Sequence, residues 1–133
     1  MKIKIGTKHE VSVTVTKEKT AAVMKSGSLE VLATPCMVAL MEQAASELCE
    51  RLVSEGITTV GTALNISHLA PTCIGGKVTA VATLVSFDGR KANFDVEAYD
   101  DSGLIGKGSH ERFTVKTEAF MKKAMERKAA TNE

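Results

Sequence analysis

The sequence has few aromatic side chains, and what it lacks narrows the range of functions. It contains no Trp and one Tyr, so stacking of aromatic rings on nucleic-acid bases is not expected. Its 17 basic and 16 acidic side chains give a formal net charge of +1, which provides no strongly charged face for nucleic acid or for a membrane surface. We therefore predict neither a nucleic-acid partner nor a membrane partner.

Cysteine is also scarce. The three residues, Cys36, Cys49 and Cys73, are odd in number and form no Cys-x-x-Cys pair, so we predict neither a disulfide framework nor a zinc site. A reducing, cytoplasmic setting fits this usage best. Cys36 falls where the first turn of a helix would stabilise a thiolate, but we expect all three cysteines to act as small packing residues.

Long apolar runs are absent as well. No stretch approaches the roughly 20 apolar residues that cross a bilayer, and no apolar segment follows the first lysines of "MKIKIGTKHE", as a signal peptide requires. The chain has 133 residues, of which 44% are hydrophobic. This size and composition predict a single domain over residues 1–133.

Hydrophobic periodicity predicts strands around one long helix. Residues 3–15 alternate like a strand or a bent strand pair, and residues 19–33 form a less regular connection, either mobile or a short helix and loop. A helix is expected from Thr34 to near Gly56, because Thr caps helices, the following Pro is favoured in the first turn and Gly is typical of the end. Four strands, at 58–69, 77–85, 91–99 and 105–116, and a polar helix from residue 117 to about 127 complete the chain.

Four such strands in a meander form an antiparallel sheet, which must bury one face. The apolar helix is the natural element to cover that face. We therefore predict an α+β hotdog fold, in which an antiparallel sheet wraps around a long central helix, and the last strands are candidates for its free edge.

Three polar side chains stand in or beside apolar segments. Glu42 lies on the rim of the helix's apolar face, where a lone glutamate more often begins the solvated side but can also form a semi-buried carboxylate of tunable pKa. His68 shares a strand face with Leu64 and Ile66, so it is either a core histidine or a residue that faces the same cavity as Glu42. Thr34 is expected to cap the helix, unless its hydroxyl reaches a reacting centre at the free N–H groups of the first turn.

Three segments, "ATPCMVALMEQAA", "GTALNISHLAPT" and "GKGSHERFTV", resemble the signature segments of the fluoroacetyl-CoA thioesterase family, one of the hotdog-fold acyl-CoA thioesterases. In that family a Thr opens the central helix, a Glu follows eight positions later and a His 26 positions after the Glu. Thr34, Glu42 and His68 match this pattern in type and spacing. The resemblance implies that these three are catalytic, that Gly61 and Arg112 bind substrate, and that the protein forms at least a homodimer.

One departure concerns the segment before Thr34. The fluoroacetate-specific enzyme carries Phe residues there as a lid over the acyl pocket, whereas "AVMKSGSLEVLA" contains no aromatic residue. We therefore predict the general thioester chemistry without the fluoroacetate preference.

The predicted function is hydrolysis of a short-chain acyl-CoA to the free acid and coenzyme A. A thioester is already activated, so no metal and no cofactor besides the coenzyme A of the substrate are expected. Glu42 would act as general base or as nucleophile, Thr34 would position the carboxylate or the acyl group, and His68 would assist proton transfer or orient water.

Two other functions compete with this prediction. A non-catalytic acyl-CoA binding or sensing domain would keep the pocket without needing all three polar residues. A hotdog enoyl-CoA hydratase would need an Asp and a His close together, and no such pair stands near Thr34. The basic run at residues 122–128 could attract the phosphates of coenzyme A, but we interpret it as a solvated helix face.

Overall fold

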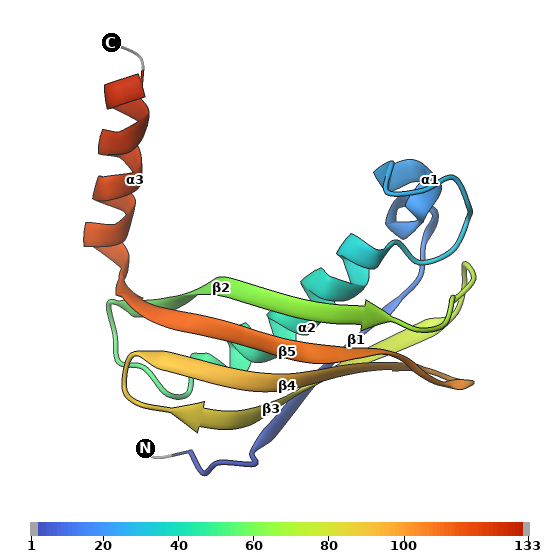
Figure 1. Cartoon of the computed structure of the whole chain (residues 1–133), viewed down its shortest axis with the longest axis horizontal. Helices are drawn as coiled ribbons and strands as arrows, with labels where there is room; N and C mark the ends of the chain where they lie inside the picture. Colours follow the sequence, from blue (N-terminus) through green and yellow to red (C-terminus); the bar gives the residue numbers. More distant parts are fainter. Residues whose placement is uncertain (1–2, 132–133) are drawn as a thin grey trace.

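The computed structural model describes residues 3–131, so the ends of the predicted domain, residues 1–2 and 132–133, lie outside the described residues. Figure 1 shows a curved sheet with one helix across its inner face and two arms that rise beyond one edge. The elements in chain order are β1 (Lys8–Thr14), η1 (Lys17–Lys19), α1 (Ala21–Met24), α2 (Thr34–Cys49), β2 (Ile57–His68), β3 (Lys77–Phe87), β4 (Lys91–Asp100), β5 (Gly103–Lys116) and α3 (Thr117–Thr131).

The five strands form one antiparallel sheet in the order β1-β3-β4-β5-β2. β3, β4 and β5 make the predicted meander, but β2 does not join it beside β3. It pairs instead with β5, with Ile57 opposite Lys116 and His68 opposite Gly106. The connection of residues 69–76 then carries the chain back across the end of the sheet to begin β3. The edges are therefore β1 and β2, and the expectation that the last strands form an edge is wrong, because β5 has a neighbour on both sides.

The core lies between α2 and the inner face of the sheet. Met37, Met41 and Leu48 of α2 are 0% exposed, as expected for a helix that the sheet covers. Four of the sheet residues that face them are alanines, which let the helix lie close to the strands at native packing density. These buried alanines are Ala80, Ala82, Ala92 and Ala98. The predicted hotdog arrangement is confirmed.

α2 is shorter than predicted and ends at Cys49 rather than near Gly56. After it, the amides of Arg51 and Leu52 bond carbonyls three residues back, which is the tighter winding of a 3₁₀ turn. Gly56 has φ +81° in the loop before β2, a conformation that glycine adopts at no steric cost. This glycine therefore marks the entry to β2 and not the end of the helix.

Thr34 is not the N-cap of α2. The cap is Ala33, whose methyl side chain cannot accept a hydrogen bond from the first turn, and Pro35 follows Thr34 within that turn. Because Thr34 is the first residue of the helix itself, its hydroxyl is not used on the helix N-terminus. Of the two roles that the sequence left open for this hydroxyl, capping is therefore wrong, and the hydroxyl is available to the site.

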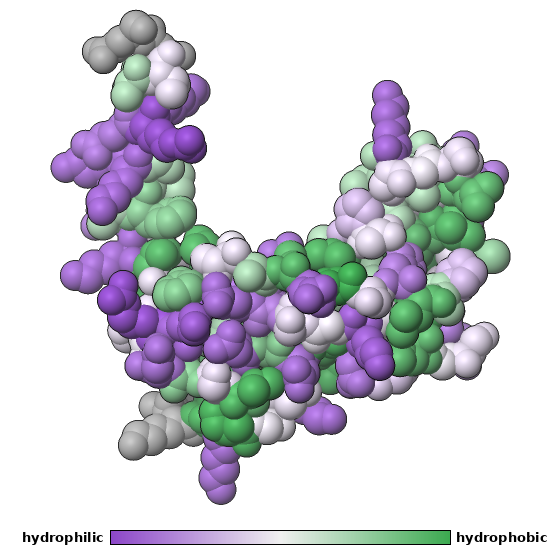
Figure 2. Space-filling model, viewed as in Figure 1, coloured by the Kyte–Doolittle hydropathy of each residue, from purple (hydrophilic) through white to green (hydrophobic). Residues whose placement is uncertain are grey.

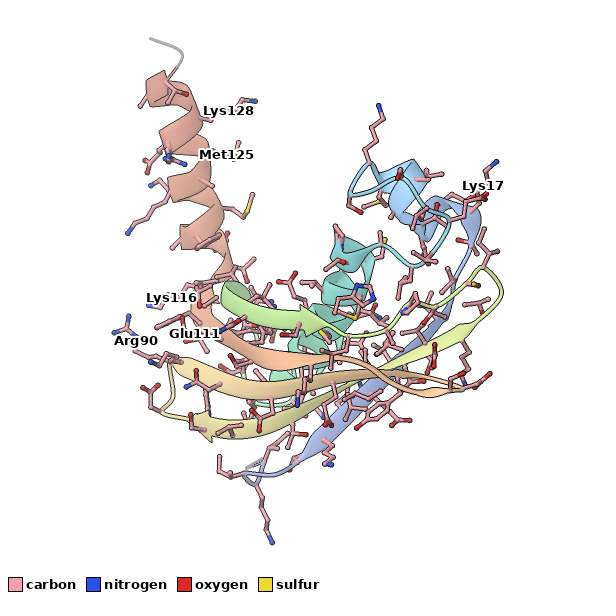
Figure 3. All side chains as sticks on the ribbon, turned by 45° about the vertical axis from the view of Figure 1, so that its right-hand side comes forward. Lys17, Arg90, Glu111, Lys116, Met125 and Lys128 are labelled. Carbon is pink, nitrogen blue, oxygen red and sulfur yellow. The ribbon has the colours of Figure 1, made fainter. Side chains whose placement is uncertain are left out.

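Two arms project past the edge strand β2 (Figures 1 and 2). We call residues 17–33, with η1 and α1, the α1 arm; it is the short helix and loop that the sequence predicted. We call α3 the α3 arm; it has no buried residue, and Figure 3 shows it standing clear of the sheet, with Lys116 at its base and Met125 and Lys128 along its free length. No helix within residues 3–131 is long and apolar enough to cross a membrane.

Candidate active site

Thr34 and His68 meet where the start of α2 approaches the end of β2. Oγ1 of Thr34 lies 2.7 Å from Nδ1 of His68, within hydrogen-bond distance. The other ring nitrogen, Nε2, is buried and has no hydrogen-bond partner among the described residues. Burial lowers the pKa of His68, so its imidazole is favoured in the neutral form. A buried polar atom without a partner calls for an explanation, and a bound ligand would provide one.

Glu42 lies on the rim of α2, as its place on the helix predicted, with its side chain 38% exposed. Its carboxylate approaches β2 at Gly61. A Cβ added to Gly61 would lie 2.6 Å from Oε2 of Glu42, so a larger residue at this position would displace the carboxylate. The predicted substrate residue Gly61 thus provides the space that Glu42 occupies.

Arg112, opposite Gly61 on β5, is 6% exposed. Its Nε donates to Oγ1 of Thr59 at 2.9 Å and its Nη2 to the Thr59 carbonyl at 3.1 Å. Its Nη1 lies 3.2 Å from Nε2 of His110 and 3.8 Å from Oε2 of Glu42. These contacts place a buried positive charge beside Glu42, and direct contact of Arg112 with substrate stays a prediction.

His110 lies in the signature segment "GKGSHERFTV", but the sequence did not reveal its contacts. It is 2% exposed, and its Nδ1 lies 2.9 Å from the carbonyl of Ala63. Burial lowers the pKa of His110, and Arg112 acts in the same direction, against the opposing effects of the Ala63 carbonyl and of Glu42. A signal was available, because His110 and Arg112 are two apart and share the inner face of a strand.

Within one chain these residues form two clusters. Thr34 and Glu42 are eight residues apart, about 12 Å along α2 by the helical rise. The seven steps from Gly61 to His68 span roughly 20 Å along β2. The structure therefore brings Thr34 to His68 and Glu42 to Gly61 and Arg112, but it gives no contact between the two clusters among the described residues.

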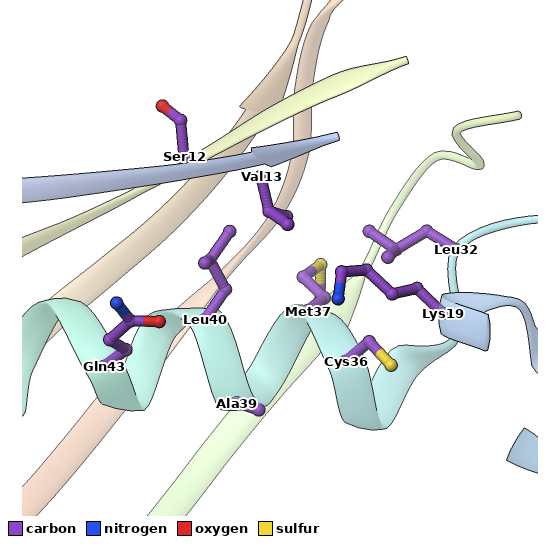
Figure 4. A pocket seen from close by; sticks show the side chains of 9 residues that line it. All are labelled: Ser12, Val13, Lys19, Leu32, Cys36, Met37, Ala39, Leu40 and Gln43. Carbon is purple, nitrogen blue, oxygen red and sulfur yellow. The ribbon is translucent and has the colours of Figure 1, made fainter. Parts of the chain in front are cut away.

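A partly enclosed pocket lies elsewhere, on the side of α2 that faces β1 (Figure 4). Its volume is about 230 Å³, and Thr34, Glu42 and His68 do not line it. Two of its polar side chains are already bonded, Ser12 to Thr79 and Gln43 to Glu47. We therefore place the candidate active site at the two clusters along β2 and not in this pocket. The residues that line the rejected pocket are Ser12, Val13, Lys19, Leu32, Cys36, Met37, Ala39, Leu40 and Gln43.

No cysteine is among the predicted site residues, although the Cys49 thiol lies near Thr59 and Arg112. Cys49 is buried in the core, and burial raises the pKa of its thiol. Cys36 is half-buried, whereas Cys73 is exposed, so the expectation that all three pack is wrong for Cys73. Over residues 3–131, no group of three or more His, Cys, Asp or Glu side chains is arranged to hold a metal ion.

Solved structures share this fold over nearly the whole chain. A crystal structure of the fluoroacetyl-CoA thioesterase FlK superposes with a TM-score of 0.90 at 31% identity, covering 95% of this chain and 98% of that one. A thioesterase superfamily member from Thermus thermophilus superposes with a TM-score of 0.86 at 31% identity, covering 97% and 98%. The fold and these relatives define a thioester hydrolase of the hotdog class.

Comparison of sequences identifies the family within this class. Residues 15–118 match the family described as fluoroacetyl-CoA-specific thioesterase. The fluoroacetyl-CoA thioesterase of Streptantibioticus cattleyicolor is 38% identical over 101 residues, which are 76% of this chain and 73% of the relative. The chain belongs to the fluoroacetyl-CoA-specific thioesterase family, as the three signature segments indicated.

The stability of the folded protein should fall as the pH decreases below about 6.5. His68 and His110 both have a pKa lowered by burial, so the unfolded chain binds protons that the folded chain does not. Their contribution is complete above the ordinary histidine pKa and is lost as the pH falls through the lower folded values. The measurement is the free energy of unfolding in urea, determined at pH values from 7 to about 5, which lie above the usual range of carboxylate pKa values.

The matched variant is His110→Gln, which cannot be protonated in this range and should show a shallower decline. A free energy of unfolding that does not change between these pH values would contradict the prediction.

Proposed function

We propose that this protein hydrolyses short-chain acyl-CoA thioesters to the free acid and coenzyme A. The observation that carries the proposal is the Thr34–His68 hydrogen bond, beside a buried Nε2 that has no hydrogen-bond partner among residues 3–131, at positions that match the family pattern. A relative in this family was crystallised in complex with fluoroacetate and CoA. No observation favours the non-catalytic alternative, since the named relatives are hydrolases.

The proposed reaction forms a carbon–oxygen bond and breaks the carbon–sulfur bond of the thioester. Glu42 takes the proton of the attacking water as general base, or attacks the carbonyl itself and is released by water in a second step. Thr34 orients His68, whose Nε2 guides water or delivers a proton to the departing thiolate. The free N–H groups in the first turn of α2, or those near Gly61, hold the developing oxyanion.

The two clusters become one site if two copies pair through β2. This edge strand is 12 residues long, and a long unpaired edge is a template for pairing with another chain. In an antiparallel pair about a twofold axis between Leu64 and Asn65, Gly61 would face His68 of the partner subunit. Glu42 would then approach Thr34 and His68 of the partner subunit, so we propose a homodimer with two composite sites.

The arms support the same assembly. Figure 2 shows an open gap between them, above β2, and a second copy turned by the twofold axis would enter it. Each arm exposes three large apolar side chains, and stable interfaces bury about 800 Å² on each partner, which a single row of edge-strand side chains does not supply. The exposed side chains are Val23, Met24 and Leu29 on the α1 arm, and Phe120, Met121 and Met125 on the α3 arm.

We also propose a cytoplasmic location. It rests on the three free thiols at Cys36, Cys49 and Cys73, which suit a reducing compartment.

Glu42→Gln should lower kcat by on the order of a hundredfold, the usual scale for a positioned acid–base group. Gln keeps the shape of Glu42 but removes its basic carboxylate, so KM should change much less. Release of free coenzyme A from acetyl-CoA measures both constants. The control is Glu47→Gln on the same helix, where the carboxylate bonds His9 on the surface. A well-folded Glu42→Gln protein with the parent's rate would refute the proposed role of Glu42.

Mixing two inactive variants should restore activity if the site spans two copies. A heterodimer of Glu42→Gln and His68→Ala chains holds one site with both groups intact and one with neither. Because half of the randomly mixed dimers are heterodimers, about a quarter of the parent activity should return. A site built within one chain predicts no recovery, so the thioesterase rate after unfolding and refolding the mixture decides between the two arrangements.

The protein should show no strong preference for fluoroacetyl-CoA over acetyl-CoA. The α1 arm contains no aromatic residue between residues 21 and 33, so it cannot form a lid of Phe side chains over the acyl group. The ratio of kcat/KM for the two substrates is the measurement. A large ratio in favour of the fluorinated substrate would mean that other residues supply the discrimination.

A further inference from the structure

We propose that His110 positions Glu42 through Arg112: the imidazole fixes the guanidinium, and the guanidinium fixes the carboxylate. This inference rests on the proposed function of Glu42 and adds a residue that does not touch the substrate. It begins from the contacts on the inner face of β5, where His110 and Arg112 are both almost fully buried.

The neighbours of His110 determine which of its ring nitrogens carries the proton. Nδ1 lies 2.9 Å from the carbonyl oxygen of Ala63, and a carbonyl only accepts hydrogen bonds, so the proton is on Nδ1. In the neutral ring Nε2 then presents a lone pair. Nη1 of Arg112, which only donates, lies 3.2 Å from Nε2. The imidazole therefore connects the backbone of β2 to the guanidinium.

Arg112 has one nitrogen left to act on Glu42. Nε and Nη2 are both bonded to Thr59, and one hydrogen of Nη1 is accepted by His110. The second hydrogen of Nη1 is free for Oε2 of Glu42, 3.8 Å away. Within the part of the chain that the structure describes, no other carboxylate lies within 4.0 Å of this guanidinium. Glu42 is thus the counter-ion of a buried charge, which is costly to leave unpaired.

Space around Gly61 makes the three side chains dependent on one another. A Cβ at Gly61 would lie 2.6 Å from Oε2 of Glu42, 3.2 Å from Cε1 of His110 and 3.3 Å from Nη1 of Arg112. The three groups therefore surround a single point. From the neighbouring strand β4, the ring of Phe94 lies beside the imidazole, with its centroid 6.3 Å from that of His110.

Protonation of His110 would break this arrangement, because Nε2 and Nη1 would then both be donors. The charged groups around the imidazole are Arg112 and Glu111 from β5 and Glu42 from α2. Burial, together with Arg112, keeps the pKa of His110 low, so the lone pair is retained at neutral pH. Alignment of Glu42 should accordingly weaken in acid.

The test compares substitutions that keep or remove the acceptor. His110→Phe keeps a ring but loses the lone pair, and kcat should fall by about tenfold to a hundredfold, the scale of a small misplacement of a catalytic group, with KM nearly unchanged. His110→Gln restores an acceptor near the place of Nε2 and should stay within about threefold of the parent, with activity extending to lower pH, because Gln does not take up a proton.

His9→Phe is the matched control, since His9 bonds only Glu47 on the surface, and it should leave kcat unchanged. If His110→Phe does not fold, His110→Asn replaces it, because Asn keeps a donor for Ala63 but does not reach Arg112. The coupling is tested in an Arg112→Met background, where His110→Phe should cause no further loss, since both changes break the same connection.

Nuclear magnetic resonance gives a readout that does not need turnover. Imidazole nitrogen shifts should report a neutral His110 with its proton on Nδ1, and the carboxyl carbon resonance of Glu42 should move in His110→Phe but not in His110→Gln. A proton on Nε2, equal impairment by Phe and Gln, or additive losses with Arg112→Met would overturn the proposal. A parent without activity on any acyl-CoA would refute the proposed function, while these resonances would still decide the role of His110.

Discussion

The structure of the site depends on one buried positive charge. Arg112 is 6% exposed, and a guanidinium removed from water needs its donors satisfied and an anion nearby. Thr59 and His110 accept its hydrogen bonds, and Glu42 supplies the anion. This constraint explains why a charge interrupts the apolar segment of α2, and why β2 has no side chain at Gly61. The carboxylate proposed for catalysis is therefore also part of the packing between helix and sheet, so activity and stability must be measured together when it is changed.

A second constraint is the length of the two elements that carry the site. α2 separates Thr34 from Glu42 by about 12 Å, and β2 separates His68 from Gly61 by more. Neither element reverses direction, although the register of β2 against β5 shifts between Gly61 and Ala63, so side-chain movement alone does not join the clusters. The clusters share the edge strand, however, and an edge strand paired with its own copy reverses direction. In the proposed homodimer, the twofold axis that pairs the free edge would also place one end of β2 opposite the other end of the partner's β2.

The sequence predicted much of this fold, because periodicity reports which face of an element is buried. It located the start of α2, every strand to within two residues except the first, and the position of Glu42 on the helix rim. Periodicity does not report which strands are neighbours, so the pairing of β2 with β5 was missed. It also does not report what a hydroxyl bonds, so capping and contact with the reacting centre both stayed open for Thr34. The contacts of Arg112 with Thr59 and of His110 with Ala63 needed the register of β5 against β2, which only the sheet itself supplies.

The contact with Arg112 also distinguishes the two oxygens of Glu42. Oε2 is the atom that faces Nη1 of Arg112 and the space above Gly61. Neither oxygen has a hydrogen-bond partner among residues 3–131, and the side chain is 38% exposed, but Oε2 lies 3.8 Å from Nη1 of Arg112. Oε2 is therefore turned toward the buried positive charge, and Oε1 is left for water or for the acyl carbon. A carboxylate that a buried charge attracts at one oxygen presents the second in a preferred direction, and this is the preorganisation that either a general base or a nucleophile requires.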